Sequence, residues 1–301
     1  MLKITPLDVN WLGHPRSIAA CLFESDGQIA LIDPGPTSSL PTLLEKLRKC
    51  GLSPVDLSAI LLTHIHLDHA GATGSLVREN PRLLVYVHSI GAPHMADPTK
   101  LLSSASRLYG DQMQRMYGDF LPVPEENLRA LEGGETIALG GRALEVVYTP
   151  GHASHHVSYF DSSDGVAFVG DTTGMRMEND PFVLPVTPPP DINLEVWETS
   201  LAAISSRRPA RLFLTHFGFS IDVDAHIAQF RERLHGWASR VHELLQNGDE
   251  NAALNAFTEW VRADLQSYLP GEETAHYLFN GGLQLSWLGL ARYWRKRTAA
   301  A

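Results

Sequence analysis

The sequence predicts an α/β protein made of two β-rich halves with interspersed helices, followed by a mostly helical tail. Short apolar runs typical of buried strands alternate with segments in which apolar residues recur at helical spacing. Metal-capable side chains follow several of these strands, and from residue 222 onward the pattern is helical and more polar. A chain of 301 residues fits one large domain or a domain with an appendage.

The first half begins with two predicted strands, which a Ser-Asp-Gly turn joins into a hairpin. A helix follows, with serines before its first turn and a glycine at its end. A buried strand, a second helix and another buried strand complete this half. In chain order these elements cover residues 17–25, 28–35, 38–51, 57–63, 70–80 and 82–88.

The second half contains a strand, a turn and a longer strand in residues 136–152, and a hairpin in residues 155–171. A helix is predicted in residues 194–207 and a last strand in residues 210–218. The proline-rich residues 185–192 indicate a stiff extended loop rather than a domain linker, because core-like sequence resumes after them.

Composition and charge restrict the classes of function. The chain is 44% hydrophobic and 19% charged, as in ordinary globular proteins, and its net charge of −10 argues against nucleic-acid binding. No apolar stretch is long enough to span a membrane, and the first residues lack the pattern of a signal peptide. Cys21 and Cys50 fit two reduced thiols better than a disulfide framework. We therefore expect a cytoplasmic protein that binds neither nucleic acid nor membrane.

The stretch "THIHLDH" places four metal-capable side chains within six positions: His64, His66, Asp68 and His69. Imidazole and carboxylate together suit divalent ions, zinc above all. A lone HxH pair often arises by chance, but further candidates follow later strands, namely His152, Asp171 and His216. Seven such residues in comparable positions indicate a metal site that could hold two ions.

The motifs "THIHLDH", "TPGH", "VGD" and "THFG", in this order, resemble those of the metallo-β-lactamase superfamily, in particular its glyoxalase II-like and lactonase-like branches. The resemblance implies an αββα sandwich over residues 1–220, with the metals at one edge between the sheets, and a helical extension over residues 221–301 packed on it. It also implies the division of the ligands. His64, His66 and His152 would hold one zinc ion, Asp68, His69 and His216 the other, with Asp171 bridging and Asp33 orienting ligands.

Several other residues are candidates for orienting the ligands or facing the substrate. His155 stands where glyoxalase II sequences often have glycine, and His156 occupies the later histidine position. A solvated turn is the alternative for both. His88 ends a predicted strand, and Met175 follows the bridging aspartate.

Two ions sharing Asp171 would also share a water of lowered pKa, and the resulting hydroxide would attack a carbonyl polarised by the first metal. Asp68 would orient the nucleophile and assist protonation of the leaving group. The expected reaction is hydrolysis of an ester, thioester, lactone or amide in a small-molecule acyl substrate. The expected cofactor is two Zn²⁺, with Fe or Mn as alternatives.

Specificity should come from the insertions around the site. Residues 88–120 carry a stripe of methionines and aromatics, which predicts core packing first and a lid as the alternative. Together with Met175, Met177 and Phe182, this stripe suggests a fairly apolar acyl pocket.

Two other functions remain open from the sequence. A persulfide dioxygenase-like oxidoreductase would use one Fe(II) held by His64, His152 and Asp171. A phosphodiesterase or nuclease is less favoured because of the acidic charge balance. Residues 279–294 are rich in leucine and aromatics, so they fit a homodimer surface, although core packing is the default.

Overall fold

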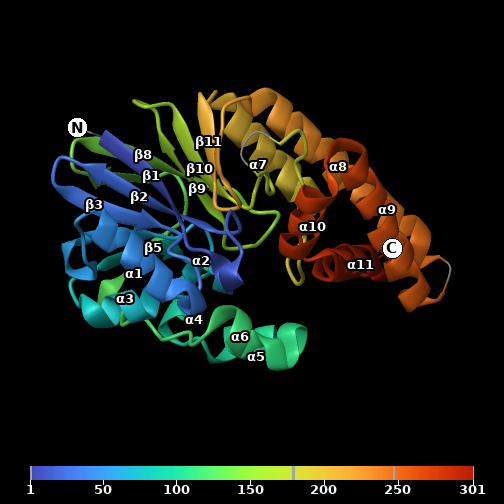
Figure 1. The fold of residues 1–301 in the computed structure, drawn as a ribbon, viewed down its shortest axis with the longest axis horizontal. Coiled ribbons are helices and arrows are strands. Elements are labelled where there is room, and N and C mark those ends of the chain that lie inside the picture. Colours follow the sequence, from blue (N-terminus) through green and yellow to red (C-terminus); the bar gives the residue numbers. More distant parts are fainter. Residues whose placement is uncertain (1, 178–179, 247, 301) are drawn as a thin grey trace.

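The computed structural model describes residues 2–177, 180–246 and 248–300 of the chain. Two β-sheets face each other, and helices cover the outer face of each sheet (Figure 1). This αββα sandwich, with helices at its C-terminal end, confirms the predicted fold class.

The first sheet is built mainly from the first third of the chain. Its order within the described residues is β1-β2-β3-β4-β5-β6. β1 to β3 pair antiparallel, and β3 to β6 pair parallel. The strands are β1 (Leu2–Asp8), β2 (Ala19–Ser25), β3 (Gln28–Ile32), β4 (Ala59–Leu61), β5 (Leu84–His88) and β6 (Leu128–Leu131).

The second sheet has the order β12-β11-β10-β9-β8-β7 in the same part of the chain. All its neighbours pair antiparallel except β10 and β11, which are parallel. The strands are β7 (Thr136–Leu139), β8 (Arg142–Tyr148), β9 (Val157–Asp161), β10 (Val166–Gly170), β11 (Arg211–Leu214) and β12 (Gly218–Ser220). The hairpins predicted in residues 136–152 and 155–171 are confirmed.

Successive side chains of β2 pack alternately into two different hydrophobic cores. Cys21 and Phe23 belong to the core between the sheets, whereas Leu22 belongs to the core under the helices of the first sheet. Side chains of a strand point alternately to opposite faces, so a strand buried on both sides reads as a continuous apolar run.

Helices of the first half cover the outer face of the first sheet and continue into the insertion at residues 88–120. They are α1 (Leu40–Lys49), α2 (Leu67–Ala70), α3 (Thr73–Glu79), α4 (Ala92–Ala96), α5 (Thr99–Tyr109) and α6 (Met113–Tyr117). The helix expected in residues 70–80 is α3, and the short helix α2 precedes it at the end of the "THIHLDH" motif.

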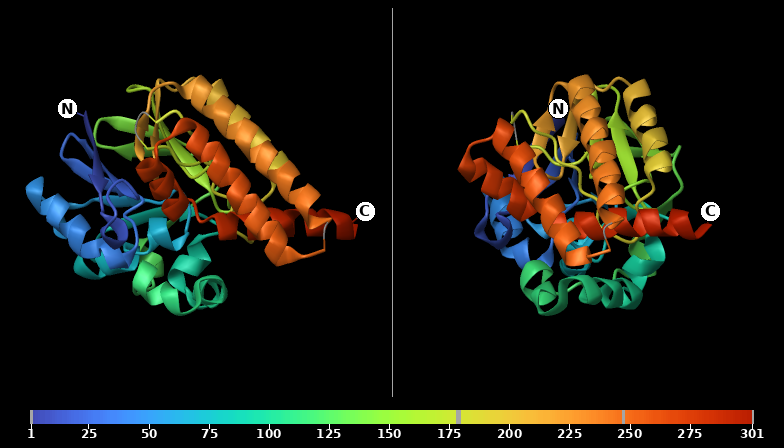
Figure 2. Two further views of the ribbon diagram at one scale, coloured as in Figure 1. Left: turned by 45° about the vertical axis from the view of Figure 1, so that its right-hand side comes forward. Right: turned by 90° about the vertical axis from the view of Figure 1, so that its right-hand side faces the viewer.

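The remaining helices are α7 (Leu194–Ser206), α8 (Val223–Leu245), α9 (Glu250–Tyr268), α10 (Gly271–Asn280) and α11 (Leu283–Ala300). α8 lies beside α7, and α9 and α11 pack on α8 (Figure 2). Trp237 of α8, Phe257 of α9 and Trp287 of α11 are buried in the same apolar cluster as Phe168 of the second sheet. No helix in the described ranges has the length and apolar character that crossing a membrane requires.

One expectation about the apolar residues near the site needs correction. Met175, Met177 and Phe182 were expected to line an acyl pocket, but they are buried in the core. Met175 pairs with Leu184 through its backbone, and none of the three lines the cavity described below. A methionine beside a metal-site motif can fill a core gap just as well as a pocket.

Gly289 lets α11 pass directly over the proline-rich loop. A Cβ at this position would meet the carbonyl oxygen of Thr187 and lie 2.9 Å from the carbonyl carbon of Pro188. We expect Gly289→Ala to lower the free energy of unfolding by about 1–3 kcal/mol, because neither backbone can yield cheaply. Gly236→Ala in α8 is the matched control, since a Cβ there meets nothing within 4 Å and should stabilise by up to about 1 kcal/mol. Urea unfolding of both variants measures this, and equal effects would contradict the close approach.

His226 is a buried histidine that joins α8 to the segment after β10. Its Nε2 donates to the Thr173 carbonyl (2.9 Å), and Ser220 Oγ donates to its Nδ1 (3.2 Å). Burial lowers the pKa of His226 from 6.5 to about 4, so in that window the unfolded chain binds a proton that the folded chain does not.

The stability that neutral His226 contributes is therefore complete above pH 6.5 and is lost as the pH falls toward 4. His226→Gln can keep the bond to Thr173 but cannot titrate. As the pH falls from 6.5 to about 4, the free energy of unfolding of the His226→Gln variant should decrease by roughly 2–3 kcal/mol less than that of the unchanged protein. Urea unfolding across pH tests this, with His235→Gln on the exposed face of α8 as control. Parallel curves for His226→Gln and the unchanged protein would contradict it.

Candidate metal centre

Three histidine nitrogens converge at the edge of the sandwich. His64 Nε2 lies 2.9 Å from His66 Nδ1, and His152 Nε2 lies 3.0 Å from the same atom. His64 and His66 follow β4, and His152 follows β8, so the two sheets contribute to one point. Ligand atoms of a tetrahedral Zn²⁺ lie about 3.3 Å from one another, close to these separations.

A second group lies directly beside the first. His216 Nε2 is 3.4 Å from Asp68 Oδ2, and His69 Nε2 is 3.9 Å from the same oxygen. Asp171, which follows β10, lies between the groups. Its Oδ1 is 3.2 Å from His69 Nε2 and its Oδ2 is 3.4 Å from His152 Nε2. The structure thus brings together all seven residues that the sequence suggested as ligands.

In three of the histidines, the ring nitrogen that faces away from the cluster donates a hydrogen bond. His152 Nδ1 donates to the Val186 carbonyl (2.8 Å), and His216 Nδ1 donates to the Ser17 carbonyl (2.7 Å). His69 Nδ1 donates to Asp33 Oδ2 (2.8 Å). Each of these three Nε2 atoms therefore faces the cluster, where it can bind a metal ion. Such outward bonds fix the tautomer and ring orientation of metal-binding histidines.

The cluster leaves buried polar atoms without hydrogen-bond partners. His69 Nε2 and Asp171 Oδ1 are both buried and neither makes a hydrogen bond. A buried unsatisfied polar atom costs free energy, and native structures seldom keep one without a reason. A divalent cation among these nitrogens and oxygens would satisfy both atoms, so the residues fit a metal.

Asp33, a candidate from the sequence for orienting ligands, lies beside His69 behind the cluster. It follows β3, is completely buried and adopts a left-handed φ of 48°. Its carboxylate accepts hydrogen bonds from Thr63 N (2.8 Å), Thr63 Oγ1 (2.7 Å), Thr215 Oγ1 (2.9 Å) and His69 Nδ1 (2.8 Å). Four donors make an isolated carboxylate tolerable in the interior.

The two groups differ in charge. Burial, with help from neighbouring imidazoles, lowers the pKa of His64 and His66 well below the usual range. Burial also acts on His69 and His216, but the carboxylates nearby, Asp171 first, outweigh it and raise the pKa of both. Although burial disfavours its charged form, His69 and His216 lower the pKa of Asp68 to about 2. Asp68 is therefore ionised across the neutral range.

The remaining candidates lie in different places. His156 Nε2 accepts from the backbone N–H of Asp171 (3.3 Å), so this histidine supports the segment that carries Asp171. His155 lines the cavity, and its Nδ1 accepts from Ile65 N (3.4 Å). His88 instead stacks on Tyr148, with ring centroids 4.4 Å apart, and is not among the residues that line the cavity.

Four supporting residues were not found from the sequence. Thr63 and Thr215 donate to Asp33, and the Ser17 and Val186 carbonyls accept from His216 and His152. A signal for the threonines does exist, because the dipeptide Thr-His occurs at both sites, in "LLTH" and "FLTH". Ser17 acts through its backbone carbonyl, which every residue type has, so the sequence could not indicate this role.

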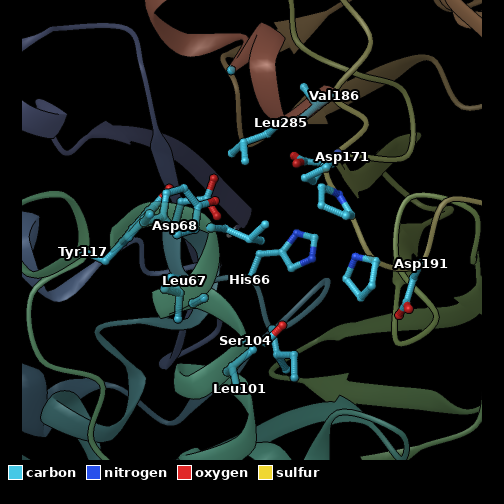
Figure 3. Close-up of a pocket in the computed structure, with 18 of the residues that line it drawn as sticks. His66, Leu67, Asp68, Leu101, Ser104, Tyr117, Asp171, Val186, Asp191 and Leu285 are labelled. Carbon is cyan, nitrogen blue, oxygen red and sulfur yellow. The ribbon is translucent and has the colours of Figure 1, made fainter. Parts of the chain in front are cut away.

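A cavity of about 380 Å³ opens beside the cluster. In Figure 3, Val186 and Leu285 lie on one side of His66, and Leu101 and Ser104 lie on the other. The volume is in the range of small-molecule sites. The insertion at residues 88–120 therefore forms one wall of the cavity, while Met95 and Phe120 of the same stripe are buried in the core.

Comparisons with known proteins agree with this architecture. A family model of the metallo-β-lactamase superfamily matches residues 14–216. The chain belongs to this superfamily.

Two relatives illustrate the similarity in sequence. The metallo-β-lactamase fold-containing protein ST1585 of Sulfurisphaera tokodaii is 31% identical over 166 residues, which cover 54% of this chain and 61% of that protein. A hydroxyacylglutathione hydrolase of a Synechococcus strain is 31% identical over 143 residues, which cover 48% of this chain and 43% of that protein. The match thus spans less than two thirds of either relative.

Two solved structures illustrate the similarity in fold. The metallo-β-lactamase family protein TTHA1429 of Thermus thermophilus has a TM-score of 0.68 at 22% identity, over 99% of this chain and 94% of that one. TTHA1623, solved in a di-iron-bound form, has a TM-score of 0.54 at 28% identity, over 70% of this chain and 93% of that one.

Asp33→Asn should weaken metal binding while keeping the fold. Asparagine suits the left-handed backbone, but its NH₂ group cannot accept from Thr63, Thr215 and His69. The ring of His69 then loses its anchor, and we expect metal affinity to fall about 10- to 100-fold. Competition with a metal-binding dye measures this.

Asp161→Asn is the matched control for Asp33→Asn. Asp161 is equally buried but pairs with Arg142, at 2.7 and 2.6 Å. It should cost stability without changing metal affinity. Equal metal affinity in both variants would contradict the role of Asp33.

Proposed function

We propose that this protein is a metal-dependent hydrolase that holds two divalent ions, zinc in the first instance, and cleaves an ester, thioester, lactone or amide. The observation that carries the proposal is the convergence of seven histidine and aspartate side chains, among which His69 Nε2 and Asp171 Oδ1 are buried without a hydrogen-bond partner. Membership of a superfamily whose relatives include hydroxyacylglutathione hydrolases supports it.

We assign His64, His66 and His152 to one ion and Asp68, His69 and His216 to the other, with Asp171 between them. When bound, the two ions would lower the pKa of a shared water and polarise the scissile carbonyl. The chain's own contribution is to hold these ligands rigidly on strand ends and to keep their lone pairs pointing inward.

Asp68 is the carboxylate that a substrate can reach. Both Asp68 and Asp171 line the cavity, but the side chain of Asp68 is 26% exposed and that of Asp171 is 2% exposed. Asp68 can therefore orient the attacking water and carry a proton to the leaving group. In this reaction the acyl bond breaks, OH goes to the acyl carbon and H goes to the leaving atom.

His64→Ala and Asp171→Ala should each lose hydrolysis and metal together. Either change removes a proposed metal ligand, so we expect kcat/KM to fall at least about a hundredfold. This loss should exceed the one caused by mutating a residue that only orients a ligand. His235→Ala on α8, whose imidazole pairs with Glu198, is the control and should keep full activity. The assay uses aryl esters, acyl-homoserine lactones and glutathione thioesters, with elemental analysis of each protein. Unchanged hydrolysis in His64→Ala would refute the mechanism.

Elemental analysis also separates this proposal from the oxidoreductase. Two ions per chain support the hydrolase, whether zinc or iron, since TTHA1623 has been solved with two irons. One iron per chain without a second ion would instead favour the dioxygenase-like alternative. The complete second group of Asp68, His69 and His216 speaks for two ions.

A further inference from the structure

The cavity beside the metal cluster has three walls from distant parts of the chain. The cluster contributes His66 and Asp68, and α5 contributes Leu101 and Ser104. Leu285, in the first turn of α11, contributes from the C-terminal helices (Figure 3). This third wall lies beyond residues 14–216, so the family match leaves the chemistry of the cavity open.

Away from the metal cluster, the lining is predominantly apolar. Its large side chains include Trp11, Leu101, Leu108, Tyr117, Phe279 and Leu285. Among the described residues that line it, Lys100 is the single lysine or arginine, and its side chain is exposed. Asp191 is already engaged, because it accepts from Ser154 Oγ at 2.6 Å. A negatively charged substrate arm would lose its hydration here without gaining a buried cationic partner.

Contacts between the walls hold the cavity open. Trp11 Nε1 donates to the Met116 carbonyl at 2.7 Å, which ties the indole to α6. The same ring stacks near Tyr117, with centroids 5.9 Å apart, and its centroid lies 5.7 Å from that of Phe279 in α10. Trp11 therefore touches both the insertion and the C-terminal helices. Walls braced in this way cannot simply close over the apolar space between them.

The loop that carries Trp11 has an energetically unfavourable backbone conformation. Asn10 and Leu12, on either side of the indole, have left-handed φ angles of 49° and 54°. Leucine seldom adopts this conformation, and such residues persist only where the surroundings enforce them. The loop is thus held in place to present Trp11 between the two walls.

We propose that this cavity binds an alkyl chain of the substrate, so that the protein hydrolyses hydrophobic esters or thioesters in preference to substrates with negatively charged arms. The scissile carbonyl would lie at the end near Asp68, and the alkyl chain would run between α5 and the turn that joins α10 to α11. This inference rests on the proposed function. Hydrolysis consumes one water and needs no other reactant.

Two substrate series test the inference with the metal-loaded full-length protein. In the first, the acyl group of a 4-nitrophenyl ester grows from acetyl to decanoyl. In the second, the alcohol of an acetate ester grows over the same range. We expect kcat/KM to rise roughly three- to fourfold per methylene in at least one series until the cavity is filled. The series that rises tells whether the alkyl chain belongs to the acyl or the leaving group. A succinyl ester should be at least tenfold slower than the butyryl ester.

Neighbouring serines on α5 provide a matched pair of variants. Ser104 lines the cavity, whereas Ser103 is exposed and does not. Ser104→Trp should fill the space and lower the ratio of decanoyl to acetyl kcat/KM at least tenfold, with unchanged metal content. Ser103→Trp adds the same side chain outside the cavity and should leave the ratio unchanged. Calorimetric binding of decanoate should weaken in Ser104→Trp alone.

The outcomes separate this inference from the proposed function. If short esters or glutathione thioesters are hydrolysed but both series are flat, the inference is overturned and the hydrolase stands. The inference is also overturned if the succinyl ester is preferred or if both tryptophan variants behave alike. If nothing is hydrolysed, the proposed function fails, and decanoate binding in the two variants still decides whether the cavity accepts an alkyl chain.

Discussion

A single buried carboxylate joins both sheets to the metal cluster. Asp33 leaves β3 and accepts hydrogen bonds from Thr63, which follows β4 of the same sheet, and from Thr215, which follows β11 of the other. It also accepts from His69, one of the proposed ligands. Because a buried charge must be satisfied, the two sheet edges can meet in only one arrangement. The rest of the site depends on that arrangement, since Thr63 and Thr215 immediately precede His64 and His216.

Much of the fold and of the site could be predicted because the signals are local. Each proposed ligand directly follows an apolar run or belongs to a short motif, as His152 does in "TPGH". Strand ends of a sandwich meet at one edge, so their neighbours converge there. Asp33 was recognisable for the same reason. The proposed metal ligands can be recognised from a few residues at the end of each strand, whereas the substrate cannot be recognised from such local sequence.

Features set by tertiary contacts were not predictable in this way. β1 carries Pro6 and lies at an edge, without the continuous apolar run of a central strand, and β6 is four residues long. Trp11 and Phe279 meet only after folding, so no sequence window could show that they share a cavity. Met175 could equally have belonged to core or pocket, and only packing decided.

The loop of residues 185–192 links events at opposite ends of the chain. Thr187 donates two hydrogen bonds to Ser286 in α11, one from its backbone N–H and one from its hydroxyl, and the adjacent Val186 carbonyl accepts from His152. One peptide unit therefore separates the C-terminal helices from a proposed metal ligand. The C-terminal helices are therefore structurally coupled to the metal site and could not be replaced independently of it. Replacing these helices with those of a relative would require replacing the loop of residues 185–192 together with α10 and α11. Changes in these segments that alter substrate preference should therefore also alter metal affinity.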